Sequence, residues 1–126
     1  MHEFIPIDPS RRLSPLEYGI LERILSADFP GSHDLRQQIR SVQVSAKCHG
    51  CPSVVFKITD KAAIPKAEVE RTVPIEAEGN DVDGMKLHIL IFVRGGYLDE
   101  MEIFREDLGK IQRLPLPENL EVLALY

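Results

Sequence analysis

MKLHILIFVRGGYLDEMEIFR, residues 85–105, predicts two β-strands joined by a tight turn at Gly95-Gly96. The first half is rich in β-branched and other apolar residues, and the glycine pair can adopt the positive φ that hairpin turns require. The second half alternates acidic with apolar residues, which is typical of a strand with one buried face. This hairpin is therefore the predicted centre of a sheet.

The register of the hairpin follows from where its carboxylates must lie. A plain two-residue loop would place Glu100 and Glu102 on the apolar face of the first strand, and a one-residue slip moves every side chain to the other face. We therefore expect an odd-numbered loop or a bulge at Gly95–Tyr97, which leaves both glutamates outside. The expected cross-strand partners are Ile91 with Met101 and Ile89 with Ile103.

Upstream of the hairpin, the sequence predicts two helices. The segment Ser14–Glu17 supplies an N-cap serine, a proline at the first helical position and the glutamate of a capping box. This helix should end near Ala27, because residues 29–31 (Phe-Pro-Gly) break helices. Ser32 is expected to cap a second, shorter helix.

The remaining pattern predicts the fold class. Between the second helix and the hairpin the apolar period becomes two, as in strands. Helices followed by strands with short connections favour an α+β domain, with two N-terminal helices packed on one face of a mainly antiparallel sheet of about five strands. The expected organisation is one domain over 1–126, with an irregular arm at 1–12, strands at 42–46, 54–58 and 71–78, and a less regular tail at 106–126.

Prolines mark the margins of this predicted sheet. Pro6 and Pro9 oppose regular structure in the N-terminal arm. Pro74 lacks an N–H for the ladder, which predicts an edge strand or a bulge. Pro117 is expected to open a short final helix.

The charge of the chain is negative and unevenly distributed. The net charge is −5, and residues 61–126 carry all of it, with eight basic and thirteen acidic side chains. A nucleic-acid-binding surface needs the opposite sign, so we expect no nucleic-acid partner. No apolar run approaches the ~20 residues that span a bilayer, and the N-terminus lacks a signal-peptide pattern. The sequence therefore predicts a cytoplasmic protein with no membrane partner.

Cys48-His49-Gly50-Cys51 is the one motif-like cluster of reactive side chains. A structural zinc site needs four ligands, and the chain has no cysteine besides Cys48 and Cys51. Redox pairs of the thioredoxin type open a helix, whereas these cysteines lie between two predicted strands. We expect a hairpin turn with two partly buried thiols and neither metal nor cofactor, with a zinc site and a redox pair as the alternatives.

One histidine and two arginines are candidates for a pocket. His88 lies in the central strand, but the sequence places no nucleophile beside it, which favours a structural histidine over a general base. Arg36 and Arg40 share a helix face, either as an anion site or as solvated charges near a helix C-terminus. We assign no catalytic residue. A small-molecule-binding protein or hydrolase with a pocket between sheet and helices is the alternative function.

Alternating carboxylates predict an acidic sheet surface. They lie at every second position on two strands and in the loop between them, and a basic protein is the partner that such a surface would fit. The loop lacks the ligand pattern of a calcium site, and a merely solvated sheet face is the competing interpretation. The candidate binding residues are Glu76, Glu78, Asp81, Asp83, Glu100 and Glu102.

Three segments resemble a family of small bacterial proteins of unknown function: CHGCPSVVFKI (48–58), VPIEAEG (73–79) and GMKLHILIFVRGGYLDEMEIFRED (84–107). The resemblance covers roughly residues 11–123 and implies a capped helix, a Cys-rich turn leading into a strand, and the central hairpin. It carries over no activity. In size and charge the chain is also similar to immunity proteins of bacterial toxin systems. The expected function is therefore a non-enzymatic interaction module, an inhibitor or immunity-type protein that binds a basic partner such as a toxin.

Overall fold

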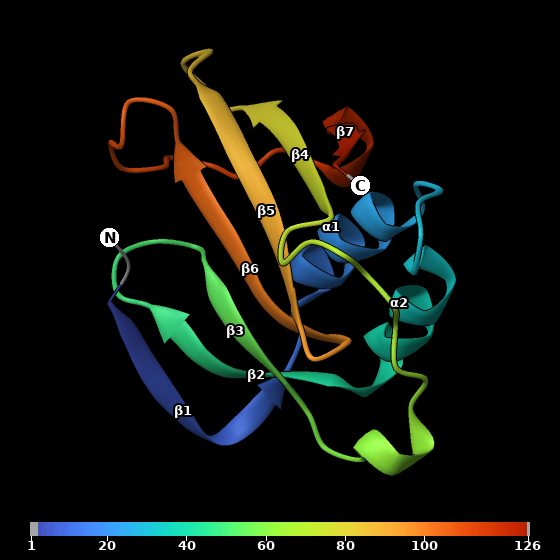
Figure 1. The fold of residues 1–126 in the computed structure, drawn as a ribbon. Coiled ribbons are helices and arrows are strands. Elements are labelled where there is room, and N and C mark those ends of the chain that lie inside the picture. Colours follow the sequence, from blue (N-terminus) through green and yellow to red (C-terminus); the bar gives the residue numbers. More distant parts are fainter. Residues whose placement is uncertain (1–2, 126) are drawn as a thin grey trace.

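The computed structural model describes residues 3–125 (Figure 1). Its helices and strands follow the chain in an order that begins and ends with a strand. They are β1 (Phe4–Arg12), α1 (Pro15–Leu25), α2 (Ser32–Gln38), β2 (Val42–Cys48), β3 (Val54–Ile58), β4 (Ile75–Asn80), β5 (Lys86–Arg94), β6 (Tyr97–Arg105) and β7 (Glu121–Ala124). Short 3-10 turns lie at Ile39–Ser41, Lys61–Ala63 and Pro117–Asn119.

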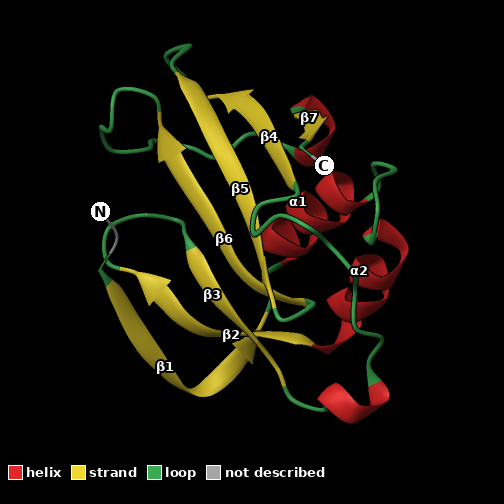
Figure 2. Ribbon diagram, viewed as in Figure 1, coloured by secondary structure: helices red, strands yellow, loops and turns green. Residues whose placement is uncertain are grey.

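The fold is α+β, as the sequence predicts, but within residues 3–125 the sheet has seven strands rather than five. The strand order is β1-β2-β3-β6-β5-β4-β7, and all neighbouring pairs are antiparallel. Figure 2 shows α1 and α2 on the same side of this sheet. The two additional strands, β1 and β7, form its two edges and come from the arm and the tail that were predicted to be irregular.

The arm forms a strand despite its prolines because it lies at an edge. β1 pairs only with β2, and the register of that pair is interrupted between Pro6 and Arg11. An edge strand has one free side, so a residue without an N–H can be accommodated there. The α1 and α2 helices consequently follow a strand instead of opening the fold.

The tail also departs from the prediction. Pro117 opens a single 3-10 turn and not a helix, and the chain then extends as β7. β7 pairs with β4, so β4 is an internal strand and not an edge. Pro74 precedes β4, and its carbonyl accepts a hydrogen bond from the N–H of Leu125 at 2.7 Å. The proline therefore bounds the strand without interrupting its ladder.

The start of α1 is the predicted capping box. The N–H of Glu17 donates to Ser14 Oγ at 3.1 Å, and Glu17 Oε1 accepts from the N–H of Ser14 at 2.8 Å. The helix ends at Leu25, two residues before the predicted end. In α2 the N-cap is Gly31, with a φ of +91°, and Ser32 is the first helical residue. Ser32 is buried, and its hydroxyl accepts from the N–H of Phe29.

The central hairpin has the predicted register. Ile89 lies opposite Ile103 and Ile91 opposite Met101, and all four side chains are buried. The turn itself contains two residues, Gly95-Gly96. The extra residue is Asp99, further along β6, because the register shifts between Phe92 and Val93. A bulge thus keeps the glutamates outside, two residues beyond the expected place.

A single hydrophobic core fills the space between the helices and the sheet. α1 contributes Ile20, Leu21, Ile24 and Leu25, all fully buried. Alternate residues of the strands meet them from the other side, so the space between the two layers is closed. Within residues 3–125 no helix is long and apolar enough to cross a bilayer. The face of the sheet opposite the helices is therefore available for recognition, as are the loops and the outer sides of the helices.

Candidate interaction surface

The side chains that point away from the helices form one continuous face over β3, β6, β5 and β4, which we term the outer face. Strand alternation puts them there, because their neighbours in sequence are buried in the core. All are half-buried. The outer face consists of Val55, Glu76, Glu78, His88, Leu90, Phe92, Glu100, Glu102 and Phe104.

On the outer face carboxylates alternate with apolar side chains across the strands. Leu90 lies between Glu76 of β4 and Glu102 of β6. Glu100 likewise lies between two apolar residues, Phe92 of β5 and Val55 of β3. Directly opposite residues have Cβ atoms about 4.5–5.5 Å apart, so each glutamate borders an apolar side chain. The result is a mixed acidic and apolar surface.

Basic groups flank this face at both ends of β5. Lys86 Nζ lies 3.2 Å from Glu78 Oε2, and the hydrogen bond to Glu78 raises the pKa of Lys86. At the other end the Arg94 guanidinium carbon lies 5.2 Å from the centre of the Phe92 ring, and Arg94 forms an ion pair with Asp99. The centre of the face is therefore more acidic than its two ends.

His88 occupies the middle of this face as a packed side chain. Its ring stacks on Phe104 with the centroids 5.0 Å apart, and Nε2 lies 3.2 Å from Glu106 Oε1. It lies opposite Glu78 on β4. The described residues bring no nucleophile into contact with it, and its neighbours are two carboxylates and a ring.

Asp81 is buried and Asp83, although exposed, is paired with Arg105 in the loop after β4, so neither lies on the outer face, which corrects the sequence-based prediction. Asp81 is 4% exposed, and its Oδ2 lies 2.9 Å from Arg105 Nη1. Asp83 and Asp107 each lie 3.0 Å from Arg105 Nη2. We term Arg105 and its three aspartates the Arg105 cluster. The Asp81 carboxylate is fully buried against Arg105, whereas those of Asp83 and Asp107 are paired with Arg105 at the surface of the loops.

Hydrogen bonds determine the ionisation of this cluster. Burial alone would raise the pKa of Asp81, but donors from the backbone N–H groups of Gln112 and Val82 and from Arg105 outweigh it and hold the pKa well below its ordinary value. The Arg105 hydrogen bond lowers the pKa of Asp107 to about 2 and also lowers that of Asp83. The three carboxylates in turn raise the pKa of Arg105. All four groups are charged at neutral pH.

Sequence reasoning missed Arg105 although the strand pattern contained a signal for it. Arg105 continues the inward series of Met101 and Ile103 along β6. An arginine at an inward position needs carboxylate partners, because an unpaired charge is too costly to bury. The two aspartates of the nearby loop 79–84 could have been predicted as these partners. The alternation of carboxylates in the sequence instead predicted both aspartates to lie on the surface.

Arg36, Arg40 and His88 do not form a common site. Arg36 Nη1 donates to the carbonyl oxygen of Leu25 at 2.9 Å, at the C-terminal end of α1. Arg40 is exposed in the 3-10 turn after α2. His88 lies on the outer face, on the far side of the sheet from both helices. A pocket between sheet and helices that uses these residues is therefore not formed, because the core fills that space.

Cys48 and Cys51 are joined by a disulfide bond and are not the two thiols expected from the sequence. The pair lies in the turn between β2 and β3, with Cys48 buried and Cys51 partly exposed. Zinc is bound by thiolates, and neither sulfur is one in this form. Among residues 3–125, no three histidine, cysteine or carboxylate side chains are arranged to hold a metal ion.

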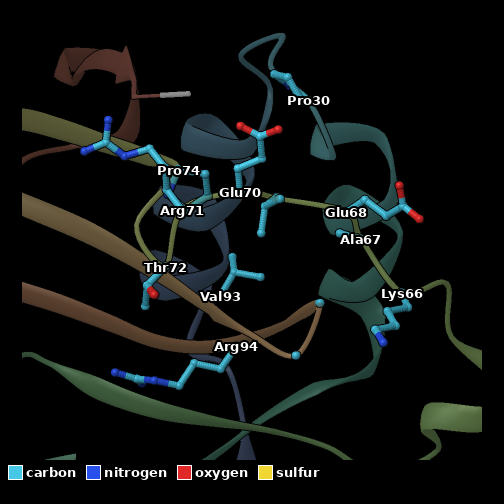
Figure 3. A pocket seen from close by; sticks show the side chains of 13 residues that line it. Pro30, Lys66, Ala67, Glu68, Glu70, Arg71, Thr72, Pro74, Val93 and Arg94 are labelled. Carbon is cyan, nitrogen blue, oxygen red and sulfur yellow. The ribbon is translucent and has the colours of Figure 1, made fainter.

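A cavity of about 940 Å³ lies between the β5–β6 turn and the segment 64–74, which we term the strap. Figure 3 shows Val93 near the middle of the lining side chains, with Lys66 on one side and Arg71 and Thr72 on the other. A small-molecule site needs a few polar groups that converge on one ligand. The charged side chains around this cavity diverge, so it is a weaker candidate than the outer face.

A family model described as a domain of unknown function (DUF6984) matches residues 10–115. The chain belongs to this family. The DUF6984 match includes both helices and strands β2 to β6, and so all residues of the outer face and the Arg105 cluster. Neither a curated protein nor a solved structure matches the chain significantly. The DUF6984 family assigns no activity, so function has to be argued from the surface itself.

Proposed function

We propose that this protein is a non-enzymatic interaction module whose outer face binds a basic protein. The observation that carries the proposal is the cross-strand alternation of glutamates with apolar side chains on that face. Solubility alone requires charge but does not require Leu90 and Phe92 between the carboxylates. A partner with lysine or arginine side chains around an apolar centre would match both components.

The energetics of such a contact follow from the half-burial of the face. Phe92 and Phe104 are already partly covered, so a partner can complete their removal from water at little cost in side-chain entropy. The four glutamates concentrate negative charge on one face, and basic side chains of a partner would be attracted to it. Lys86 and Arg94 at the margins would disfavour a partner that extends positive charge beyond the face.

We further propose that the module acts as an inhibitor of the immunity type, in the cytoplasm, by covering the basic surface of its partner. Electrostatic complementarity of this kind raises the association rate and weakens with added salt. The association rate should therefore be high at low ionic strength and should fall as the salt concentration rises. A basic toxin is the partner class that this charge pattern favours.

A charge reversal on the face tests the proposal. We expect Glu100→Lys/Glu102→Lys to keep the fold, because both side chains point away from the core and remain partly exposed, and thermal melts of each variant check this. The variant should lose capture of the basic protein that the wild type retains from its native host at low salt. The captured protein is identified by mass spectrometry, and its association rate with each variant is then measured with purified components.

The strap supplies a matched control. Glu68→Lys/Glu70→Lys changes the net charge by the same amount at two exposed positions off the outer face. This variant should bind nearly as well as the wild type, because specific contacts and local field, not total charge, govern the interaction. An equal loss of binding in both double variants would show that net charge alone causes the effect. Equal capture by all three proteins would refute the outer face as the binding surface.

A further inference from the structure

The turn between β2 and β3 holds a disulfide whose two cysteine residues differ in exposure. Cys48 is 6% exposed, whereas Cys51 is partly exposed, and their Cα atoms lie 5.2 Å apart. We propose that Cys48–Cys51 is a reversible two-electron redox centre that exchanges with dithiols through the sulfur of Cys51. The proposal does not rest on partner binding by the outer face, although Glu100 and Glu102 border both that face and the cavity beside the disulfide.

The fold holds this turn in place without the disulfide. The N–H of Cys48 donates to the carbonyl oxygen of Ser53 at 2.9 Å, and the N–H of His49 donates to that of Glu3 at 2.8 Å. The buried Ser53 hydroxyl accepts from the N–H of Ile103 at 2.8 Å and lies 3.2 Å from its carbonyl oxygen. These bonds attach the turn to β6 and to Glu3, the residue before β1. Opening the disulfide therefore leaves the backbone anchored.

The bond also contributes little as a structural crosslink. It connects residues only three apart, and the stabilisation by a disulfide in the chain-entropy model is smallest for the shortest loop. Neither cysteine belongs to the hydrophobic cluster between the helices and the sheet. Reduction of this bond is therefore expected to cost the fold little. In the cytoplasm predicted from the sequence, lasting disulfides are rare, and those that occur are mostly catalytic or redox-sensing.

A cavity gives an approaching thiol access to the pair. It measures about 710 Å³ and is bordered by the Cys48–Cys51 turn, the outer side of β6 and the loop after β6. Leu108 on that loop is 81% exposed, and Lys110 is also exposed. Glu100 and Glu102 border the cavity from β6. A dithiol can thus approach the turn from solvent through a cavity lined by both apolar and charged side chains.

The exchange is a balanced two-step reaction. A thiolate of the dithiol attacks Cys51 Sγ, the Cys48–Cys51 bond breaks, and Cys48 leaves as a thiolate that takes up a proton. The second thiol of the dithiol, after losing its proton, attacks the mixed disulfide and releases Cys51 as a thiolate, which is protonated in turn. The dithiol is oxidised to a disulfide, and the protein pair gains two electrons and two protons. The reverse sequence oxidises the protein pair.

The full-length chain in mixtures of reduced and oxidised dithiothreitol tests reversibility. We expect both thiols to appear together as the mixture becomes more reducing, and to disappear again on reoxidation, with an unchanged circular dichroism spectrum. Alkylation followed by mass measurement counts the thiols. A pair that is reduced only after urea unfolds the chain, or a fold that is lost on reduction, would overturn the proposal.

Two single variants test which sulfur reacts. Glutathione disulfide should modify the remaining cysteine of Cys48→Ser at least about tenfold faster than that of Cys51→Ser, because reactivity follows access. In urea the two rates should become equal, which checks that the difference arises from the fold. Equal rates in the folded variants would refute the role of Cys51. Should either variant fail to fold, the wild-type titration in dithiothreitol still decides reversibility.

Discussion

Arg105 illustrates how one side chain connects separate segments of this chain. Its guanidinium contacts carboxylates from the β4–β5 loop and from the turn after β6. Asp81 also accepts from the backbone N–H groups of Gln112 and Arg113, so the cluster fixes the start of the tail as well. Burying a charge is tolerated only with such a complete set of partners. Removing the cation should therefore loosen several segments at once.

The first prediction concerns the substitution Arg105→Gln. At pH 7 the melting temperature should fall clearly, because Asp81 and its neighbours keep their charge without the guanidinium. The pKa values of Asp81, Asp83 and Asp107 lie below the ordinary value of 3.8 in the folded chain. Their contribution to stability is thus present above about pH 4 and is lost as the pH falls through the folded values.

The wild-type chain should consequently lose stability on acidification below about pH 4, and the difference from the variant should shrink there. Arg113→Gln is the control, because that side chain is exposed and only its backbone N–H contacts Asp81. Thermal melts from pH 7 to pH 2 check both statements. A difference between wild type and Arg105→Gln that stays constant with pH would contradict the assigned ion pairs.

Gln38 provides the second prediction at this scale. Its buried amide donates to the carbonyl oxygens of Pro65 and Gly96 and accepts from the N–H of Leu98, each at 2.9 Å. Gln38→Leu keeps the approximate volume but removes these bonds, so we expect a loss of about 1–3 kcal/mol in the free energy of unfolding. The same change at exposed Gln37 should have little effect. Urea denaturation of both variants measures the contrast.

At the scale of elements, the strap depends on a close approach to the hairpin turn. The N–H of Ala67 donates to the carbonyl oxygen of Gly96 at 2.9 Å, and the N–H of Val93 to that of Thr72 at 2.8 Å. A Cβ at Gly96 would lie 2.7 Å from the Ala67 oxygen and would also meet Lys66 Cγ. The strap can therefore pack this closely against the turn only because Gly96 has no side chain.

The two glycines of the turn allow a controlled comparison. Both have positive φ, +61° at Gly95 and +87° at Gly96, so alanine is strained at either position. A Cβ at Gly95 meets nothing within 4 Å. We expect Gly96→Ala to lower the melting temperature well beyond Gly95→Ala, because only Gly96 adds a steric conflict with the strap. Similar losses in the two variants would show that the strap is not packed against the turn.

The elements that sequence predicts well are those fixed by neighbouring residues. The capping box at Ser14 and the register that pairs Ile91 with Met101 both follow from local spacing. β7 was missed, because its four residues form a strand through pairing with β4. The outward direction of the four glutamates follows from alternation. The burial of Asp81 does not, since it depends on Arg105 and on backbone groups some thirty residues away.

At the scale of the whole molecule, the uneven charge of the sequence does not correspond to two separate units. The core draws on both halves: α1 and β2 from the balanced half pack with β4, β5 and β6 from the acidic half. Four carboxylates of the acidic half lie on the outer face and three in the Arg105 cluster, and the others are distributed over the strap, the bulge in β6, the turn after β6 and the tail. The two halves of the sequence that differ in charge therefore fold as one unit around a shared core.

A shared core predicts that a local truncation weakens the entire fold. Ile89 is fully buried at the centre of the sheet, opposite Ile103 and Ala77 on its two neighbouring strands. Ile89→Ala should cost about 2–5 kcal/mol in the free energy of unfolding, since it removes buried volume that the packed core cannot refill. Leu108→Ala, at a position 81% exposed, should leave stability nearly unchanged. Urea unfolding should remain a single transition that shifts to lower urea for Ile89→Ala alone. An unshifted midpoint, or a split into two transitions, would contradict one cooperative core that includes all seven described strands.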